Sequence, residues 1–306
     1  MSSWEGKTRG GVLGYKIFIW ILKKTGISFA YFFLRFVVLY FVFTSGKAFS
    51  SIFYYFRKIQ KYNIIKSFIS VFQNYYIFGQ VLLDKIALLA GLETGLTFNF
   101  EGEEHLQQMQ KGGVLVSAHV GNWEIAGQLL NRLEKKINII LFDAEHQQVK
   151  KYLTDVMSQR NVHFIIIRDD YSHLLEIREA LANHEIIAMH GDRFIEGNKT
   201  VQLNFMGEPA LFPLGPVHLA SRFRVPVSFV FAVKERRKHY HFFATPLLHI
   251  PGHANLHQRD AALTEAVKVY VGKLEEILKK YPLQWFNYYP FWSVPSDLSP
   301  ITETAN

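Results

Sequence analysis

The feature that most constrains the fold is a basic, aromatic N-terminal quarter with no acidic residue between Gly6 and Leu83. That stretch holds eleven Lys and Arg residues, and with Glu5 included, residues 1–83 carry a net charge of +10. Because the whole chain carries +8, residues 84–306 carry −2. Aromatic residues gather in the same place, since 22 of the 47 Phe, Tyr and Trp lie between Tyr15 and Phe78. The N-terminal quarter therefore needs an environment that accepts both apolar rings and positive charge.

Two kinds of partner suit basic residues interleaved with aromatic ones. Single-stranded nucleic acid stacks its bases on aromatic rings beside a basic groove. A membrane accepts apolar side chains among its acyl chains and attracts Lys and Arg to anionic headgroups. Here the aromatics sit in apolar runs such as Phe36–Phe43, which would be insoluble as an exposed stacking surface. The pattern favours a membrane over nucleic acid.

The apolar stretch Ile27–Thr44 predicts one long helix, at the short end of the roughly 17–25 residues that span a bilayer. Arg35 lies in its middle, which is costly for a lone lipid-facing helix. A helix that spans, one that enters a single leaflet and one buried in a protein core all remain open. The stretch is not a convincing signal peptide, because it starts late and no small-residue cleavage site follows it cleanly.

After Gly91 the chain changes to short β-branched runs that alternate with helical stretches. This alternation predicts an α/β fold with a largely parallel, twisted sheet and helices on both faces. We therefore expect a membrane-associated helical region at 1–90, broken at Gly26 and at Ser45-Gly46, and an α/β domain at 91–306. The predicted strands are Gly113–Ala118, Ile137–Phe142, Val162–Ile167, Glu185–His190, Val201–Phe205, Pro226–Val233 and Tyr240–Pro246. The predicted helices are Asn122–Leu133, His146–Gln159, Tyr171–Ala182, Phe212–Phe223 and Leu256–Tyr281.

Several classes of chemistry lack their residues. The chain has no cysteine, which excludes disulfides, thiolate metal sites and cysteine nucleophiles. It also lacks the G-x-S-x-G elbow, the G-x-x-x-x-G-K-[ST] phosphate loop, the G-x-G-x-x-G fingerprint and the H-E-x-x-H metal motif. We therefore expect no metal in the site.

The strongest chemical signal is the segment SAHVGNWE, Ser117–Glu124. An apolar strand delivers His119 to its C-terminal end, the edge of an open α/β sheet where ligands bind. Gly121 lets the chain turn, and Asn122 is a good N-cap for the helix that follows. Glu124 in the first helical turn could reach back to one ring nitrogen of His119, leaving the other as a base. The alternative is an ordinary loop histidine beside a capping glutamate.

His119 and Glu124 in HVGNWE resemble the H-x4-[DE] motif of the lysophospholipid acyltransferase superfamily. Within it, the chain most resembles the bacterial lipid A late acyltransferase family, over roughly Trp4 to Trp292. The likeness includes the opening Gly-Gly-x-x-Gly-Tyr, the Gly191-Asp192-Arg193 loop and Phe212-Pro-Leu-Gly-Pro216. It implies that His119 is the catalytic base for an acceptor hydroxyl and that Glu124 orients it. The hydroxyl would attack an acyl thioester directly, with no acyl-enzyme and no cofactor.

Four further residues are expected in the substrate-binding site: Asn122, Asp192, Arg193 and Gly215. Arg193 follows the strand Glu185–His190, and an Arg at that edge can pair with a phosphate or an oxyanion. Asp192 could fix Arg193 or His190, and a plain Asp–Arg ion pair in a turn is the alternative. Gly215 permits close backbone approach at a helix start, where free N–H groups can bind an anion, although the segment also suits an ordinary turn.

For the other histidines and the C-terminal aromatic segment, a structural or packing role is an alternative to a functional one. His190, His163, His173 and His184 are interpreted as structural or surface residues, while His146 is ambiguous. The segment Gln284–Trp292 (QWFNYYPFW) could line an acyl channel or rest on a membrane interface. Plain packing in the core is the more ordinary role, since buried aromatic residues usually just pack.

The resemblance also implies partners and a location. The co-substrate would be a thioester of acyl carrier protein or of coenzyme A, and the acceptor a lipid such as a lipid A precursor. The protein would act at the cytoplasmic face of the inner membrane and bind no nucleic acid. Two departures weaken the assignment of lipid A as acceptor: Phe142-Asp143 replaces an Arg-Pro pair, and Asn287-Tyr-Tyr-Pro290 replaces basic residues. An aryl-polyene or another specialised lipid is the alternative acceptor, and a non-enzymatic lipid-binding protein is the alternative function.

Overall fold

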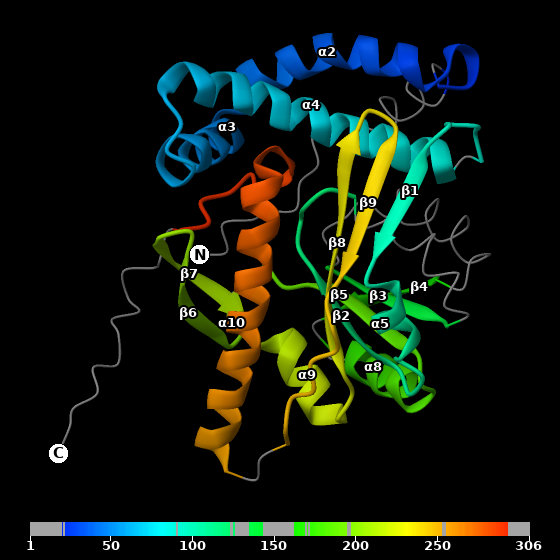
Figure 1. Cartoon of the computed structure of the whole chain (residues 1–306), viewed down its shortest axis with the longest axis vertical. Helices are drawn as coiled ribbons and strands as arrows, with labels where there is room; N and C mark the ends of the chain where they lie inside the picture. The colour runs from blue at the N-terminus through cyan, green and yellow to red at the C-terminus, as the bar shows by residue number, and fades with distance from the viewer. Residues whose placement is uncertain are drawn as a thin grey trace, which may run out of the picture.

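The computed structural model describes residues 20, 22–89, 91–122, 125, 135–142, 162–168, 170, 172–194, 197–252 and 255–292. The N-terminal part is helical, and most of the remainder is a largely parallel sheet flanked by helices (Figure 1). This is the α/β class, with a helical N-terminal region, that the sequence predicted. The helices predicted over Asn122–Leu133 and His146–Gln159 lie mostly or wholly outside the described residues.

The N-terminal helices lie together at one end of the sheet, with α2 and α4 alongside each other (Figure 1). Gly26, with a φ of 77°, precedes α2, and Ser45 separates α2 from α3, so both predicted breaks are confirmed. Leu34 packs so closely on Gly79 that a Cβ there would lie 2.6 Å from Leu34 Cδ1. The bounds are α2 (Ile27–Thr44), α3 (Gly46–Tyr54), the π-helical turn η1 (Tyr55–Ile59) and α4 (Ile64–Leu89).

The main sheet has the strand order β1-β9-β8-β2-β5-β3-β4 within the described residues. Its central strand β2 pairs in parallel with both β5 and β8, whereas β9 returns antiparallel to β8. The strands are β1 (Thr97–Glu101), β2 (Gly113–Ser117), β3 (Ile137–Phe142), β4 (Val162–Ile167), β5 (Ile186–His190), β8 (Val227–Arg236) and β9 (His239–Ala244). The remaining helices are α5 (Glu103–Gln107), α8 (Ser172–Ala182), α9 (Gly215–Phe223), α10 (Leu256–Lys280) and the short η4 (Pro282–Gln284).

Every residue of β2 is buried, as expected for a parallel strand covered on both faces. Val114 and Val116 join a core cluster with Val217 of α9 and Val267 of α10. Leu115, between them, points into a second cluster on the other face of the sheet. This packing fixes the strand that leads directly to His119.

Two strands were missed by the sequence analysis. One is β1, at the edge of the main sheet; the other is β7 (Glu208–Pro213), which pairs antiparallel with β6 (Thr200–Phe205). Met206 and Gly207 both have positive φ, 54° and 95°, as a tight hairpin turn requires. The helix predicted over Phe212–Phe223 begins only at Gly215, because Phe212 and Pro213 still belong to β7.

Candidate active site

Two neighbouring strands carry the catalytic candidates to one edge of the sheet. In the pairing of β2 with β5, Ser117 lies opposite His190. Two residues beyond these strand ends come His119 and Asp192. The carboxyl edge of parallel strands is where ligands bind in open α/β folds. The two loops predicted to reach this edge therefore lie side by side.

His119 is held by Asp192 through two hydrogen bonds. Its backbone N–H donates to Asp192 Oδ2 over 2.9 Å, and its ring Nδ1 lies 2.8 Å from Asp192 Oδ1. An ionised carboxylate only accepts hydrogen bonds, so Nδ1 donates and Nε2 carries the ring's lone pair. The Asp192 side chain is 2% exposed, whereas that of His119 is 25% exposed. A buried carboxylate thus orients a histidine that still reaches the surface of the site.

The electrostatics keep Asp192 ionised. Burial by itself would raise the pKa of this carboxyl, but His119, His190 and Arg193 all favour the charged form. The net result is an Asp192 pKa well below its ordinary value. Asp192 was expected to fix Arg193 or His190, but its side chain accepts hydrogen bonds from His119 and Trp285 instead.

The His190 ring lies against the His119 ring in a tilted arrangement, with the two ring centroids 4.0 Å apart. Burial lowers the pKa of His190 well below its ordinary value, and neighbouring His119 lowers it further. His190 therefore stays neutral around pH 7. His190 was expected to be a structural or surface residue, and its ring packs against that of His119.

Two glycines let the loops approach so closely. Gly121 has a φ of 62°, and a Cβ on it would lie 1.9 Å from the carbonyl oxygen of Ala232. A Cβ on Gly191 would lie 2.8 Å from Val116 Cγ1 and 2.9 Å from Tyr270 Cζ. The turn expected at Gly121 is thus a position that only glycine fits without strain.

The C-terminal aromatic segment crosses both loops. The backbone N–H of Phe286 donates to the carbonyl of His119 over 2.8 Å. Trp285 Nε1 donates to Asp192 Oδ2 over 3.1 Å, and the Tyr289 hydroxyl donates to the Asp192 carbonyl over 3.0 Å. The sequence was consistent with an acyl-channel, membrane-interface or packing role for this segment, and its contacts to the two candidate loops were not predicted.

Arg193 also contacts this segment. Its Nη2 donates to the carbonyl of Phe286 over 3.1 Å, and its guanidinium lies 5.6 Å from the centre of the Tyr289 ring. The guanidinium lies at the same edge of the sheet as His119, and a guanidinium can pair with a negatively charged group.

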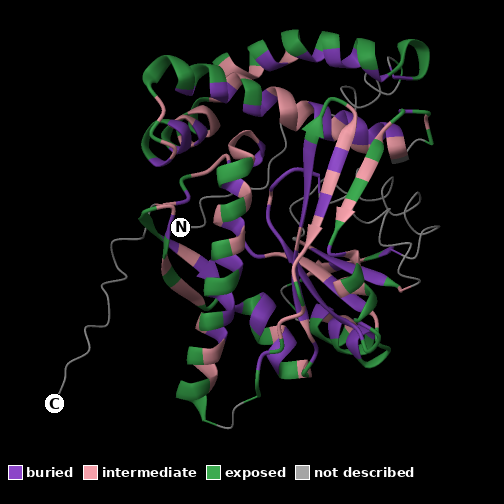
Figure 2. Cartoon of the chain, viewed as in Figure 1, coloured by how far each residue is buried: buried purple, intermediate pink, exposed green. Residues whose placement is uncertain are grey.

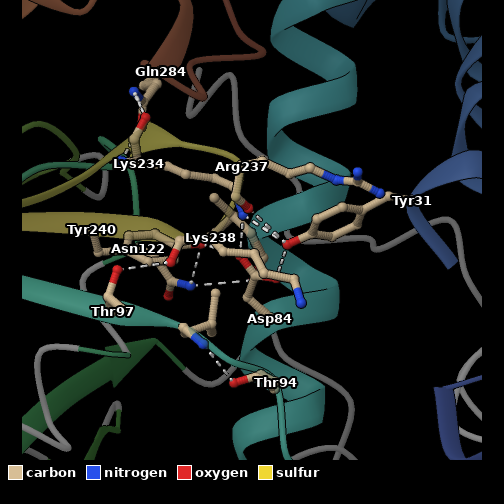
Figure 3. Close-up of polar contacts among 12 residues, drawn as sticks. Tyr31, Asp84, Thr94, Thr97, Asn122, Lys234, Arg237, Lys238, Tyr240 and Gln284 are labelled. Carbon is tan, nitrogen blue, oxygen red and sulfur yellow. Dashed lines mark hydrogen bonds and ion pairs between the residues drawn. The ribbon is translucent and has the colours of Figure 1, made fainter. Parts of the chain in front are cut away.

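Asn122 has a different environment from the one expected of a substrate-binding residue. Its Oδ1 accepts from the N–H of Ile125 over 3.3 Å, which fits the predicted capping role. Its Nδ2 donates to the carbonyl of Val81 over 3.2 Å and lies 3.5 Å from the Tyr240 hydroxyl. With 1% exposure, this side chain faces the core between α4 and β9 and is closed to a substrate (Figure 3).

Gly215 begins α9, and a Cβ on it would meet no atom within 4 Å. The close approach of another part of the chain is therefore not what places a glycine there. Glu124, the predicted orienting carboxylate, lies outside the described residues, as do Asp143 and His146.

A buried charged cluster lies beneath Asn122 (Figure 3). Asp84 of α4 accepts hydrogen bonds from Lys234 of β8, Tyr240 of β9 and Tyr31 of α2. The Lys234 ammonium also donates to the Tyr31 hydroxyl over 2.8 Å. The cluster joins the N-terminal helices to the sheet that carries the site.

Among the described residues, one group has the spacing to hold a metal ion: His119, His190 and Asp192, with ligand atoms within 4.8 Å of one another. Here the Asp192 oxygens accept from three donors, His119 N, His119 Nδ1 and Trp285 Nε1. A cation would have to displace some of these bonds. The arrangement fits an oriented histidine base better than a metal site.

Comparisons with known proteins identify a family. A model of the bacterial lipid A biosynthesis acyltransferase family matches residues 12–292. A search of curated proteins found no match. Among solved structures, the chain is similar to the 1-acyl-sn-glycerophosphate (LPA) acyltransferase PlsC from Thermotoga maritima, with 17% identity and a TM-score of 0.39. That match covers 79% of this chain and 95% of the other.

Proposed function

Because the chain belongs to the bacterial lipid A biosynthesis acyltransferase family, and so is an acyltransferase that acts on lipid substrates, we propose that His119 is its general base. The reaction moves a fatty acyl group from a thioester carrier to a hydroxyl group of a lipid. Asp192 orients His119 through Nδ1. The same role was predicted for Glu124, which lies outside the described residues, so that prediction stays open.

The proposed chemistry uses one proton twice. His119 Nε2 takes the proton of the acceptor hydroxyl as the oxygen attacks the thioester carbonyl. The resulting imidazolium is stabilised by the Asp192 carboxylate on Nδ1. When the tetrahedral intermediate collapses, the carbon–sulfur bond breaks and the thiol leaves with that proton. The products are an ester and the free thiol carrier, and His119 is neutral again.

The observation that carries this proposal is the contrast in exposure across one hydrogen bond. A 2% exposed carboxylate holds Nδ1 of a ring that is 25% exposed. A histidine needed only for packing would not require a fully buried ionised partner, whose desolvation is costly. An oriented base does need one, because the carboxylate fixes the tautomer.

We assign acyl carrier protein, or coenzyme A, as the thioester carrier, and a lipid A precursor or another specialised lipid as the acceptor. Arg193 is the group placed to meet a phosphate or a developing oxyanion. We place the site at the cytoplasmic face of the inner membrane, where these carriers occur.

Helix α2 is the proposed membrane attachment. Within the described residues it is the one helix long and apolar enough to span, with a mean hydropathy of 1.9. Its inner face packs on α4, and the Tyr76 hydroxyl donates to the Tyr31 carbonyl over 3.0 Å. Its outer face is exposed (Figure 2) and carries Phe29, Phe32, Phe33, Phe36, Leu39, Tyr40 and Phe43. We propose that this outer face of α2 lies in one leaflet of the membrane. The inner face of α2 stays packed against α4.

The test is acyl transfer by the purified full chain in vesicles, with acyl carrier protein and coenzyme A thioesters supplied separately. Lipid products from a lipid A precursor and from a total lipid extract are identified by mass spectrometry. We expect a new acyl ester from wild type and none above background from His119→Ala. Equal product from both proteins would refute His119 as the base.

A further inference from the structure

The C-terminal segment Gln284–Tyr289, which we call the clasp, contacts both catalytic loops at once. On the His119 loop, the Gln284 carbonyl accepts from Gly121 N–H over 2.9 Å, and Phe286 N–H donates to the His119 carbonyl over 2.8 Å. On the other loop, Trp285 and Tyr289 both donate to Asp192. The clasp therefore fixes the distance between His119 and Asp192, the two residues that we call the dyad.

The clasp is itself anchored on two sides. Asn74 of α4 donates from Nδ2 to the carbonyls of Leu283 and Trp285, each over 3.0 Å. The Gln284 side chain exchanges two hydrogen bonds with the backbone of Lys234, over 2.7 and 2.9 Å (Figure 3). Both anchoring residues are buried, so water does not compete with these bonds.

Trp285 is the member of the clasp that touches the carboxylate directly. Among the described residues, Asp192 Oδ2 accepts hydrogen bonds from two donors, the His119 backbone N–H and the Trp285 indole N–H. The indole ring is fully buried, with its centre 5.2 Å from the Tyr55 ring and 4.9 Å from the Phe291 ring. A donor held this rigidly keeps the carboxylate in one rotamer, with Oδ1 facing His119 Nδ1.

We propose that Trp285 is a positioning residue for acyl transfer, acting on His119 through Asp192. This proposal rests on the proposed function. Removing the indole N–H lets the Asp192 carboxylate rotate away from Nδ1, so the base loses its orientation while the substrates still bind. The rate of the chemical step should fall, and KM should not change.

The test compares Trp285→Phe with Trp292→Phe in the full chain. Trp292 belongs to the same aromatic cluster and donates from Nε1 to the Phe205 carbonyl over 3.2 Å, without contacting Asp192. We expect Trp285→Phe to lower kcat by at least roughly tenfold, the lower end for one hydrogen bond to a charged group, with KM unchanged within about twofold. Trp292→Phe should keep kcat within about twofold. Equal losses of kcat in the two variants would overturn the proposal.

A double-mutant cycle separates positioning from packing. If Trp285 acts through Asp192, Trp285→Phe should cost little further activity in an Asp192→Asn background. Fully additive losses would refute the proposal.

Should Trp285→Phe fold poorly, Tyr289→Phe is the second variant. It removes only the hydroxyl that donates to the Asp192 backbone, and we expect a several-fold loss of kcat. An unchanged kcat for Tyr289→Phe would then count against the clasp.

The outcomes also distinguish this proposal from the proposed function. Loss of activity in His119→Ala with full activity in Trp285→Phe would leave the general base in place and reject only the positioning role. Full activity in both variants would reject the catalytic role of His119 itself.

Discussion

At the scale of single residues, Gly121 is the position with least freedom. Its φ of 62° and the 1.9 Å approach of the Ala232 oxygen leave no room for a side chain. We expect Gly121→Ala to lower the free energy of unfolding by about 2 kcal/mol or more and to displace His119. Gly272→Ala in α10, where a Cβ meets nothing within 4 Å, is the control and should stabilise by up to about 1 kcal/mol. Urea unfolding in detergent measures both, and a Gly121→Ala protein of wild-type stability would contradict this account.

His190 gives a prediction for pH. Because its pKa is depressed below the ordinary 6.5, the unfolded chain takes up a proton below that pH that the folded chain does not. Its contribution to stability is thus complete above pH 6.5 and is lost as the pH falls. We expect the unfolding free energy of wild type to fall more steeply than that of His190→Asn between pH 6.5 and about 5. Parallel curves from chemical unfolding would show that His190 does not titrate as described.

Sequence reasoning placed His119 and Asp192 at one edge of the sheet but did not predict that they bind each other. His119 and Asp192 were each predicted at the ligand edge, because each follows an apolar strand. That they bind each other depends on β2 and β5 being neighbours in the sheet, which the order of strands along the chain does not specify. Trp285 was missed for the same reason: it meets Asp192 across 93 residues of sequence, and only the folded sheet brings them together.

At the scale of elements, α2 is the helix whose exposed face needs a partner. Phe32 and Phe36 are 52% and 58% exposed, while Leu34 between them is buried. We expect the double variant Phe32→Ser, Phe36→Ser to bind anionic phospholipid vesicles at least tenfold more weakly. The reason is that moving each ring from water into the membrane contributes about 1–2 kcal/mol to the binding free energy. Leu175→Ser on α8, also an exposed leucine, should leave binding unchanged. Sedimentation with vesicles is the measurement, and equal binding by all three proteins would exclude the α2 face as the attachment.

The pattern of elements was predicted best where apolar residues dominate. The strand leading to His119 and the helix breaks at Gly26 and Ser45 followed from residues with strong local preferences. The strand β7 was missed because Pro209 and Pro213 within it suggest a turn, and prolines are tolerated there because the β6–β7 pair stands apart from the main sheet. The edge strand β1 has alternating exposure and pairs with β9 far along the chain, so its sequence carries only a weak signal.

At the scale of the whole molecule, the Asp84–Lys234 cluster joins the N-terminal helices to the catalytic sheet. Removing one partner of a buried ion pair leaves the other charge without compensation. We expect Lys234→Met to lower the unfolding free energy by about 3–5 kcal/mol and to loosen α2 from the sheet. The exposed pair of Lys268 with Glu265 is the control, and Lys268→Met should cost less than about 1 kcal/mol. Similar losses from the two variants, measured by thermal unfolding, would mean that the cluster does not hold the parts together.

The same architecture links the proposed membrane attachment to the proposed active site. Helix α4 packs against α2 on one side and supports the clasp through Asn74 on the other. The clasp in turn holds His119 and Asp192. His119 and Asp192 are therefore positioned by the clasp together with α4, and α4 also supports α2, the proposed membrane attachment.

The most direct test of the central claim is the single-turnover rate of acyl transfer by Asp192→Asn, with the thioester bound before the acceptor is added. If Asp192 orients His119 and stabilises its imidazolium form, the rate should fall by roughly two to four orders of magnitude while the thioester still binds. Asp260→Asn, which removes an exposed carboxylate paired with Lys199, should stay within about twofold of wild type. An Asp192→Asn enzyme that turns over at the wild-type rate would contradict the account.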